Sequence, residues 1–400
     1  EEKSQSQLLQ EKWEPLLESE KVPEITCPYR RKVTAQLLEN QEKFLNEAAN
    51  VSADVAGFTP TVISMVRRMA PKLIAFDVAG LQALNMPNGR IFAIRARYAS
   101  AAAPVSAQAE ALFNEADTDY SGTGVHAGTD PFSAGYTTGT GKATAAGETD
   151  PWAAMGLSIE AVDVSVKTRQ LRADYSLELA QDMRAIHGLD ADNELSSILV
   201  NQVTAEINRE VIRTIYGIAK VGASFATVPG TFDMAADTDG RWAGERYACL
   251  MFAIERDANA IGLETKMGKG NILITSADVA SALAMAGLLS YTAAIKDITN
   301  MEVDTTGPTF AGTIGRFRVF VDPYLSTNGY VVGYRGASQY DAGFFYCPYV
   351  PLQMVRATDP VNFQPAIGYK TRFGLVENPF TTMAAGQNIY YRKAKVTSLR

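Results

Sequence analysis

Two alternating strands that flank a long stretch of small residues limit what this chain can fold into. Residues 90–98, RIFAIRARY, alternate between apolar side chains and arginines, with Phe92, Ile94 and Tyr98 on one side and Arg95 and Arg97 on the other. Residues 158–167, SIEAVDVSVK, alternate in the same way, and a period of two predicts a β-strand. About 60 residues rich in Gly, Ala, Ser and Thr separate the two strands, which is too long for a loop inside a compact domain. The pattern predicts an extended, hairpin-like arm with a glycine-rich tip.

The chain after this arm predicts helices followed by a mixed region. Apolar residues recur almost every fourth position over 193–219, which predicts one long amphipathic helix. Shorter helices are expected over 176–187 and 241–262. Beyond residue 271, short apolar strands and a helix at 277–289 predict a separate α/β domain.

The first 47 residues differ in charge from the chain that follows. They hold ten Glu and seven Lys or Arg, whereas residues 48–66 hold one charged residue, Asp54. Two short amphipathic helices are predicted here, over 7–20 and 33–45. Short charged helices separated by prolines are typical of docking segments. The alternative is a permanent arm whose charges form a solvated face.

Composition and charge argue against several functional classes. The 400 residues are 46% hydrophobic and 20% charged, which predicts a globular chain of two or three domains. A net charge of −7 and a pI near 5.2 argue against a strong nucleic-acid binder, although not against a weakly acidic surface facing DNA. The cysteines, Cys27, Cys249 and Cys347, are too far apart for a disulfide framework and fit a reducing compartment. The sequence contains no run of about 18 apolar residues, so no membrane span is predicted. The charged N-terminus does not resemble a signal peptide.

Three motifs suggest chemistry but do not satisfy its requirements. GYTTGTGKAT has one residue too many for a phosphate loop, and Ala143 stands where Ser or Thr should hold magnesium. DADNEL at 190–195 lacks the glycine of a calcium loop, and an acidic helix start explains it more simply. The two histidines, His126 and His187, form no metal site with such remote cysteines. We therefore predict a structural protein with no catalytic site, no metal and no cofactor.

Several long stretches carry a specific resemblance to a known family. They are RRMAPKLIAFDVAG, PNGRIFAIRARY, RQLRADYSLELAQDMRAIHGLDADNELSSILVNQVTAEINREV, RWAGE, YDAGFFYCPYVPLQMVRATDPVNFQPAIGYKTRFGL, LLQEKWEPLLESEKVPEI and LLENQEKFLNE. On these stretches, the chain resembles the major capsid protein of T-even-type tailed phages over about four fifths of its length.

The resemblance implies an α+β fold, the tailed-phage major capsid fold. Its expected parts are an N-terminal scaffold-docking propeptide (1–47), an N-terminal arm (48–89), an extended E-loop hairpin (90–172), a P-domain with a long spine helix (173–262), an A-domain (263–376) and a C-terminal return to the P-domain (377–400). No inserted extra domain is expected, because 99–150 is too short and too rich in glycine. A decoration protein is one source of the contacts that such a domain would supply.

The resemblance also implies a structural subunit of an icosahedral or prolate phage head. The subunits are expected to self-assemble into hexamers, with pentamers as a further state, around packaged double-stranded DNA in weak, non-specific proximity. Expected partners are the scaffold protein, the prohead protease, the portal, and vertex or decoration proteins. The expected location is the virion shell, after assembly in the bacterial host cytoplasm. Two alternatives stay open: the vertex paralogue of the same fold, and an enzyme with a long binding arm, which predicts a convergent polar pocket.

The resemblance places a proteolytic site at the charge boundary. In this family the prohead protease resembles an enzyme that cuts after Glu in a Leu-x-Glu setting, which Leu45, Glu47 and Ala48 supply. Contacts between subunits are expected at Arg67, Arg68, Lys72, Arg95, Arg97, Lys142 and Glu148. The first three stand at the foot of the N-terminal arm, beside the E-loop strand that carries the next two. Some of these cations are expected to pair with acidic residues of adjacent subunits, the alternative being solvated charges. The tip around Lys142 is expected to become ordered only against a neighbouring subunit.

Overall fold

The computed structural model describes residues 5–17, 28–48, 73–99, 109–113, 115–128, 131–132, 134–150, 152–238, 242–285, 309–338, 341–359, 364–381 and 384–399. The chain divides into two compact units, a body (residues 1–89 and 163–400) and an arm (residues 90–162). Among the described helices, none is long and apolar enough to cross a membrane.

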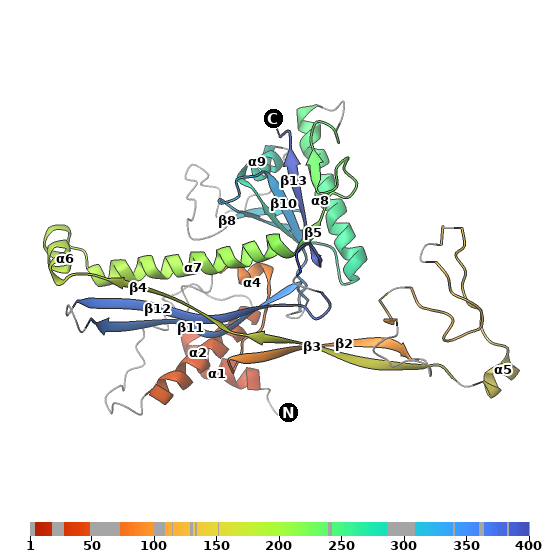
Figure 1. Cartoon of the computed structure of the whole chain (residues 1–400), viewed down its shortest axis with the longest axis horizontal. Helices are drawn as coiled ribbons and strands as arrows, with labels where there is room; N and C mark the ends of the chain where they lie inside the picture. The colour runs from red at the N-terminus through yellow and green to blue at the C-terminus, as the bar shows by residue number, and fades with distance from the viewer. Residues whose placement is uncertain are drawn as a thin grey trace. The chain divides into compact units, whose positions relative to one another are not determined.

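The arm is built on two long strands, as the alternating sequence predicts. Strands β2 (Asn88–Ala99) and β3 (Ala154–Ser165) pair as a two-stranded sheet (Figure 1). Beyond them, the described tip residues form turns, isolated bridges such as Thr123 to Thr140, and a six-residue helix, α5 (Thr144–Thr149). The expectation of no inserted domain in 99–150 stays a prediction.

The body contains a four-stranded sheet flanked by a long helix. The strand order is β1 (Gly80–Leu81), β11 (Phe344–Thr358), β12 (Pro365–Glu377) and β4 (Lys167–Asp174). Helix α7 (Ala191–Ile218) packs along β12 and β4. Its buried stripe follows the predicted periodicity and includes Leu199, Val203, Ile207, Val211, Ile215 and Ile218. Asp192 and Glu194 lie in its first turn, where the helix dipole favours them.

A seven-stranded sheet forms the second part of the body. Its strand order is β5 (Ala219–Val221), β13 (Asn388–Thr397), β10 (Gly329–Gly333), β7 (Ile272–Thr275), β9 (Phe317–Val321) and β8 (Thr309–Ile314), with β6 (Thr231–Asp233) also paired to β13. Helices α8 (Ala243–Thr265) and α9 (Ala277–Met285) pack on this sheet. β7 is buried along its whole length, which explains its unbroken apolar sequence ILIT.

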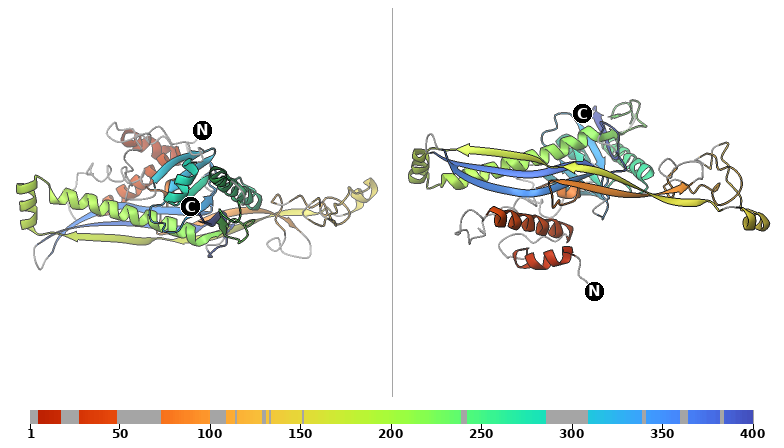
Figure 2. Two further views of the ribbon diagram at one scale, coloured as in Figure 1. Left: turned by 90° about the horizontal axis from the view of Figure 1, so that it is seen from above. Right: turned by 60° about the horizontal axis from the view of Figure 1, so that its bottom comes forward.

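Two N-terminal helices complete the body. They are α1 (Gln5–Leu17) and α2 (Pro28–Ala48). The short helix α4 (Ala75–Val78) lies in the next described range of the chain. α1 packs on α2, and α2 packs on β11. Figure 2 shows the pair on a different side of the four-stranded sheet from α7.

The structure differs from the expected part boundaries at two points. β4 pairs with β12 of the body, so the expected E-loop end at 172 includes strand residues that belong to the body. β11 and β12 lie in the sheet beside α7, whereas β13 lies within the seven-stranded sheet. The expected span 263–376 therefore contributes strands to both sheets. The expected span 377–400 contributes its strand to the seven-stranded sheet, beside strands of 263–376. Chain order alone does not indicate sheet membership here, because strands far apart in sequence pair within both sheets.

Candidate assembly surfaces

One face of the arm is apolar and open to solvent. Phe92 and Ile94 on β2, and Leu157 and Ile159 on β3, are each 63–72% exposed. Alternate residues of a strand point to opposite faces, and the hydrogen bonds between arginines of β2 and polar residues of β3 define the other face. The four apolar side chains therefore share one face of the two-stranded sheet.

The opposite face of the arm carries a closed network of charges. Arg95 contacts Glu110 at 3.2 Å and Glu160 at 3.3 Å. Arg97 donates to Glu160 at 2.8 Å and to Ser158 at 2.9 Å. Both arginines thus have partners within their own chain, which the sequence pattern did not indicate, and their pairing with a neighbour stays a prediction. The other three predicted cations, Arg67, Arg68 and Lys72, lie outside the described residues.

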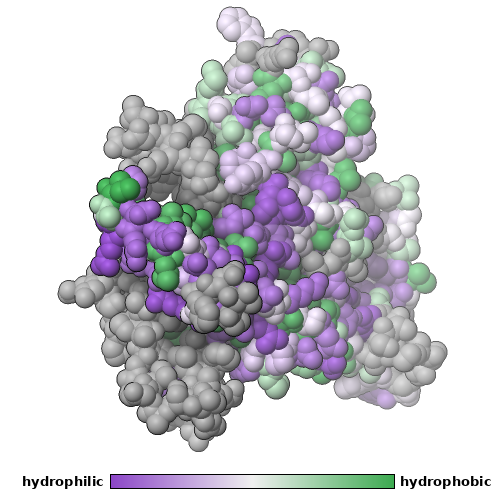
Figure 3. All heavy atoms as spheres, turned by 60° about the vertical axis from the view of Figure 1, so that its left-hand side comes forward, coloured by the Kyte–Doolittle hydropathy of each residue, from purple (hydrophilic) through white to green (hydrophobic). Residues whose placement is uncertain are grey.

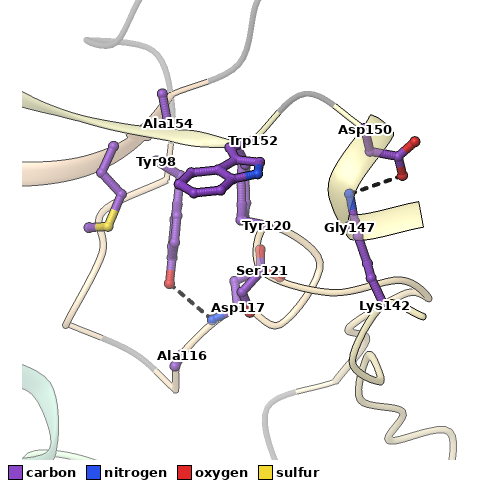
Figure 4. A pocket seen from close by; sticks show the side chains of 12 residues that line it. Tyr98, Ala116, Asp117, Tyr120, Ser121, Lys142, Gly147, Asp150, Trp152 and Ala154 are labelled. Carbon is purple, nitrogen blue, oxygen red and sulfur yellow. Dashed lines mark hydrogen bonds and ion pairs between the residues drawn. The ribbon is translucent and has the colours of Figure 1, made fainter. Parts of the chain in front are cut away.

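The tip of the arm holds an aromatic pocket of about 570 Å³. The rings of Tyr98 and Tyr120 stack with centroids 4.3 Å apart, and the Tyr98 hydroxyl accepts a hydrogen bond from the Asp117 backbone N–H at 3.1 Å. Trp152 lines the same pocket and is 90% exposed (Figure 4). A large aromatic side chain in water is the kind of surface that partners cover.

The two predicted contact residues of the tip lie at or near this pocket. Lys142 lines it, and its Nζ lies 3.4 Å from Asp150 Oδ2. Glu148 is exposed on α5. Nearby, Tyr136 donates to Glu115, and this hydrogen bond raises the pKa of Tyr136.

The N-terminal helix α2 is anchored in the body. Val33 and Leu37 belong to the main hydrophobic core. The Asn40 Nδ2 donates to the backbone carbonyls of Leu84 and Tyr349, both at 2.9 Å. The apolar face of α2 thus forms part of the core of the body.

Helix α1 covers α2 from outside through a small second core. Trp13, Leu17, Ala35 and Leu38 form this cluster. Lys12 pairs with Glu39 at 2.8 Å and with Glu42, and these hydrogen bonds, the one from Glu39 first, raise the pKa of Lys12. α1 and α2 together form a two-helix unit, which we call the N-terminal helix pair.

The predicted processing site lies at the end of this pair. Leu45, Glu47 and Ala48 occupy the last turn of α2, which ends at Ala48. The residues that follow Ala48 lie outside the described part of the chain up to residue 73.

One buried carboxyl of the body has a structural role. Asp257 on α8 is 1% exposed and accepts hydrogen bonds from the Ala223 backbone N–H and the Tyr330 hydroxyl, both at 2.9 Å. Burial raises its pKa. Such a group is closed to any substrate and holds the loop after β5 against α8.

Histidines and carboxylates are dispersed over the described part of the chain. Within the described ranges, no three His, Cys, Asp or Glu side chains are arranged to hold a metal ion. His187 ends a π-helical turn (Met183–His187) before Gly188, whose φ is 67°.

The face shown in Figure 3 is mostly hydrophilic, with hydrophobic side chains in small separate groups.

Sequence comparison decides the family. A family model described as major capsid protein Gp23 matches residues 55–396. This chain belongs to that family. The major capsid protein of Salmonella phage ViI is 40% identical over 98% of this chain and 98% of its own, and that of Enterobacteria phage T4 is 35% identical over 99% of both. The capsid vertex protein of phage T4 matches less well, at 26% identity over 54% of this chain and 51% of its own.

Family membership confirms the function class and the fold class that the resemblance implied. A Gp23-type major capsid protein is a structural subunit of the phage head and not an enzyme. The chain has an α+β architecture with an extended arm and a long helix beside a sheet. Among solved structures, the capsid of Myoviridae phage XM1 is similar with a TM-score of 0.41 and 11% identity, covering 81% of this chain and 92% of that one.

Proposed function

We propose that this capsid protein assembles into hexamers that build an icosahedral or prolate head, with pentamers as a further state. The exposed apolar face of the arm is the observation that carries the proposal. A two-stranded sheet is marginally stable alone, and its four large apolar side chains stay in water unless another surface covers them. A neighbouring subunit supplies that cover, and head-to-tail contacts that close produce rings. Each subunit is then expected to bury far more than the roughly 1,600 Å² of a standard interface.

Electron microscopy of the purified protein tests this assembly. Six-membered rings or closed shells are the expected result. A monomer that persists at high concentration would contradict the proposal, and rings with five members alone would favour the vertex paralogue.

We also propose that residues 1–47 are a propeptide that docks onto the scaffold and is removed after Glu47. Ten Glu and seven Lys or Arg give this segment a net charge of −3, so removal changes the chain from −7 to −4. A less negative inner wall reduces repulsion of the packaged DNA. The protease acts at the end of α2, where the last helical turn frays most readily.

Mass spectrometry of infectious particles tests the processing. A subunit beginning at Ala48 is expected. A full-length subunit in DNA-filled heads would support the permanent arm instead.

The remaining partners follow from the same proposal. The portal, vertex proteins and decoration proteins complete the head, and assembly takes place in the host cytoplasm. The cluster of Arg67, Arg68 and Lys72 pairs with acidic residues of adjacent subunits. Arg68→Glu is then expected to impair shell assembly more than it lowers the melting temperature of free subunits, and equal small effects would favour solvated charges.

A further inference from the structure

The pocket at the arm tip has the size and lining of a small-ligand site. Its volume of about 570 Å³ lies within the roughly 300–1,000 Å³ of typical ligand pockets. Aromatic rings with a few polar side chains line it, which is the usual composition of such a site. Its lining residues run from Tyr98 to Met155, all within the arm, so a single chain forms the pocket.

Aromatic rings lie on one side of the pocket, and Lys142 and Asp150 lie on the other (Figure 4). Tyr98 and Tyr120 are the stacked pair, with ring centroids 4.3 Å apart, and Trp152 lines the pocket on the same side, 90% exposed. The face of an aromatic ring attracts a cation placed over it, and Trp attracts it most strongly. The indole of Trp152 is therefore a ready contact for a cation that enters the pocket.

The tip carries most of the net negative charge of the chain. Residues 111–152 hold six Asp or Glu and one Lys, which is a net charge of −5, whereas the whole chain has −7. Two of these carboxylates, Asp117 and Asp150, line the pocket. Lys142 also lines it, but its charge is offset by Asp150, whose Oδ2 lies 3.4 Å from the lysine Nζ. A concave site surrounded by charge of one sign concentrates ions of the opposite sign.

Other classes of ligand fit these observations less well. The negative potential of the tip repels an anion such as a nucleotide. An apolar ligand would bury the carboxylates without compensating their charge, which costs free energy. A divalent metal ion prefers several converging oxygen ligands, whereas this pocket presents aromatic rings beside two carboxylates. A positively charged organic group uses both features.

We propose that the tip pocket binds an organic cation, an alkylammonium or guanidinium group that packs on Trp152 while Asp117 and Asp150 compensate its charge. Two sources carry this chemistry: a free amine of the polyamine type, and a Lys or Arg side chain of a neighbouring copy. Binding of a free cation does not depend on the proposed assembly, because every lining residue comes from one chain.

Calorimetric titration of the unassembled full-length chain tests the pocket. The probe is 1,4-diaminobutane, a linear chain with an ammonium group at each end. Its neutral analogue 1,4-butanediol is one control, and magnesium chloride, which supplies a cation of the same charge without the carbon chain, is the other. We expect one probe molecule to bind per chain, about tenfold or more tighter than either control, because only the probe combines charge with a surface that packs on the rings.

Two pairs of matched variants locate the binding. Trp152→Ala should weaken it about fivefold or more, whereas Trp242→Ala, at a Trp of the body that is 84% exposed, should leave it unchanged. Asp150→Asn should weaken it more than Glu148→Gln, which removes the same charge from the tip but does not line the pocket. All four side chains are exposed, so the melting temperature of each variant should match that of the wild type.

Titration of assembled shells distinguishes the two sources. Binding that persists in shells indicates a free cation. Binding that is lost there, with a carbodiimide cross-link from Asp117 or Asp150 to a Lys of another copy, indicates a side chain of a neighbour. If no shells form, the proposed assembly fails, and the result for the free chain still decides the pocket. No binding of the probe by the free chain, equal binding of magnesium, or equal effects of Trp152→Ala and Trp242→Ala would overturn the proposal.

Discussion

Replacing Leu37 by Ala tests whether the N-terminal helix pair is part of the core of the body. Leu37 is 7% exposed and clusters with residues of α7 and the seven-stranded sheet. A buried Leu→Ala change costs about 2–5 kcal/mol, with the larger values at sites that cannot collapse. Asn40, one turn further on, fixes α2 to two carbonyls and limits such collapse. We therefore expect the bound state of α2 to lose about 3 kcal/mol relative to its undocked state.

Hydrogen exchange of the full-length chain measures this loss at α2. Since about 1.4 kcal/mol corresponds to a tenfold change, the protection of the α2 amides should fall about 100-fold. Leu8→Ala is the matched control, because Leu8 on α1 is 52% exposed and the same truncation there should change stability by no more than about 0.5 kcal/mol. Equal effects of the two variants, or unchanged protection of α2 in Leu37→Ala, would refute the anchoring of this helix.

Three further predictions follow from the arm, a buried carboxyl and two glycines. Leu157→Glu should block ring formation with little change in the melting temperature of the monomer, whereas Val228→Glu, at a similarly exposed site of the body, should leave rings intact in electron micrographs. The pKa of Asp257 is raised in the folded state, so the free energy of unfolding should fall as pH rises from the unfolded pKa of 3.8 through the raised pKa. Urea titrations at several pH values should show that Asp257→Asn loses this pH-dependent part of the stability. The same dependence of stability on pH in the wild type and in Asp257→Asn would contradict the prediction. Gly343→Ala should destabilise by about 1–3 kcal/mol, because its Cβ would lie 2.5 Å from the Tyr391 ring, while Gly217→Ala in α7, with nothing within 4 Å, should stabilise by up to about 1 kcal/mol in the same unfolding assay.

Helices and strands that have one distinct apolar face could be predicted from the sequence. The helix expected over 193–219 is α7 at 191–218, because its apolar stripe packs along one side throughout. The arm strands were predictable for the opposite reason. Their alternation separates an apolar face from a charged face, and both are visible in the sequence before any partner is known.

The pairing of distant segments was not predictable in this way. Asn40 donates to the carbonyl of Tyr349, 309 positions away, and no local pattern in the sequence marks this Asn as an anchor. The same limitation applies to the expected part boundaries, since a strand sequence indicates burial but not which sheet the strand joins. From the sequence, Arg95 and Arg97 were expected to pair with neighbouring subunits. Their partners Glu110 and Glu160 are distant in the chain and come close to the arginines only once the hairpin forms.

The anchoring of α2 also constrains when the proposed propeptide could be removed. Burying Val33 and Leu37 contributes roughly 3–6 kcal/mol at 1.5–3 kcal/mol for each side chain. That is a large part of the 5–15 kcal/mol by which a typical domain is stable. A free subunit that lost the N-terminal helix pair would therefore lie close to unfolding. In an assembled shell, contacts at the arm face would offset the loss, so removal after assembly is the order that keeps the body folded. On this argument, protease added to free subunits should yield aggregated or degraded protein, whereas protease added to assembled shells should yield intact subunits beginning at Ala48. Stable, soluble subunits beginning at Ala48 from the free protein would show that α2 does not stabilise the body.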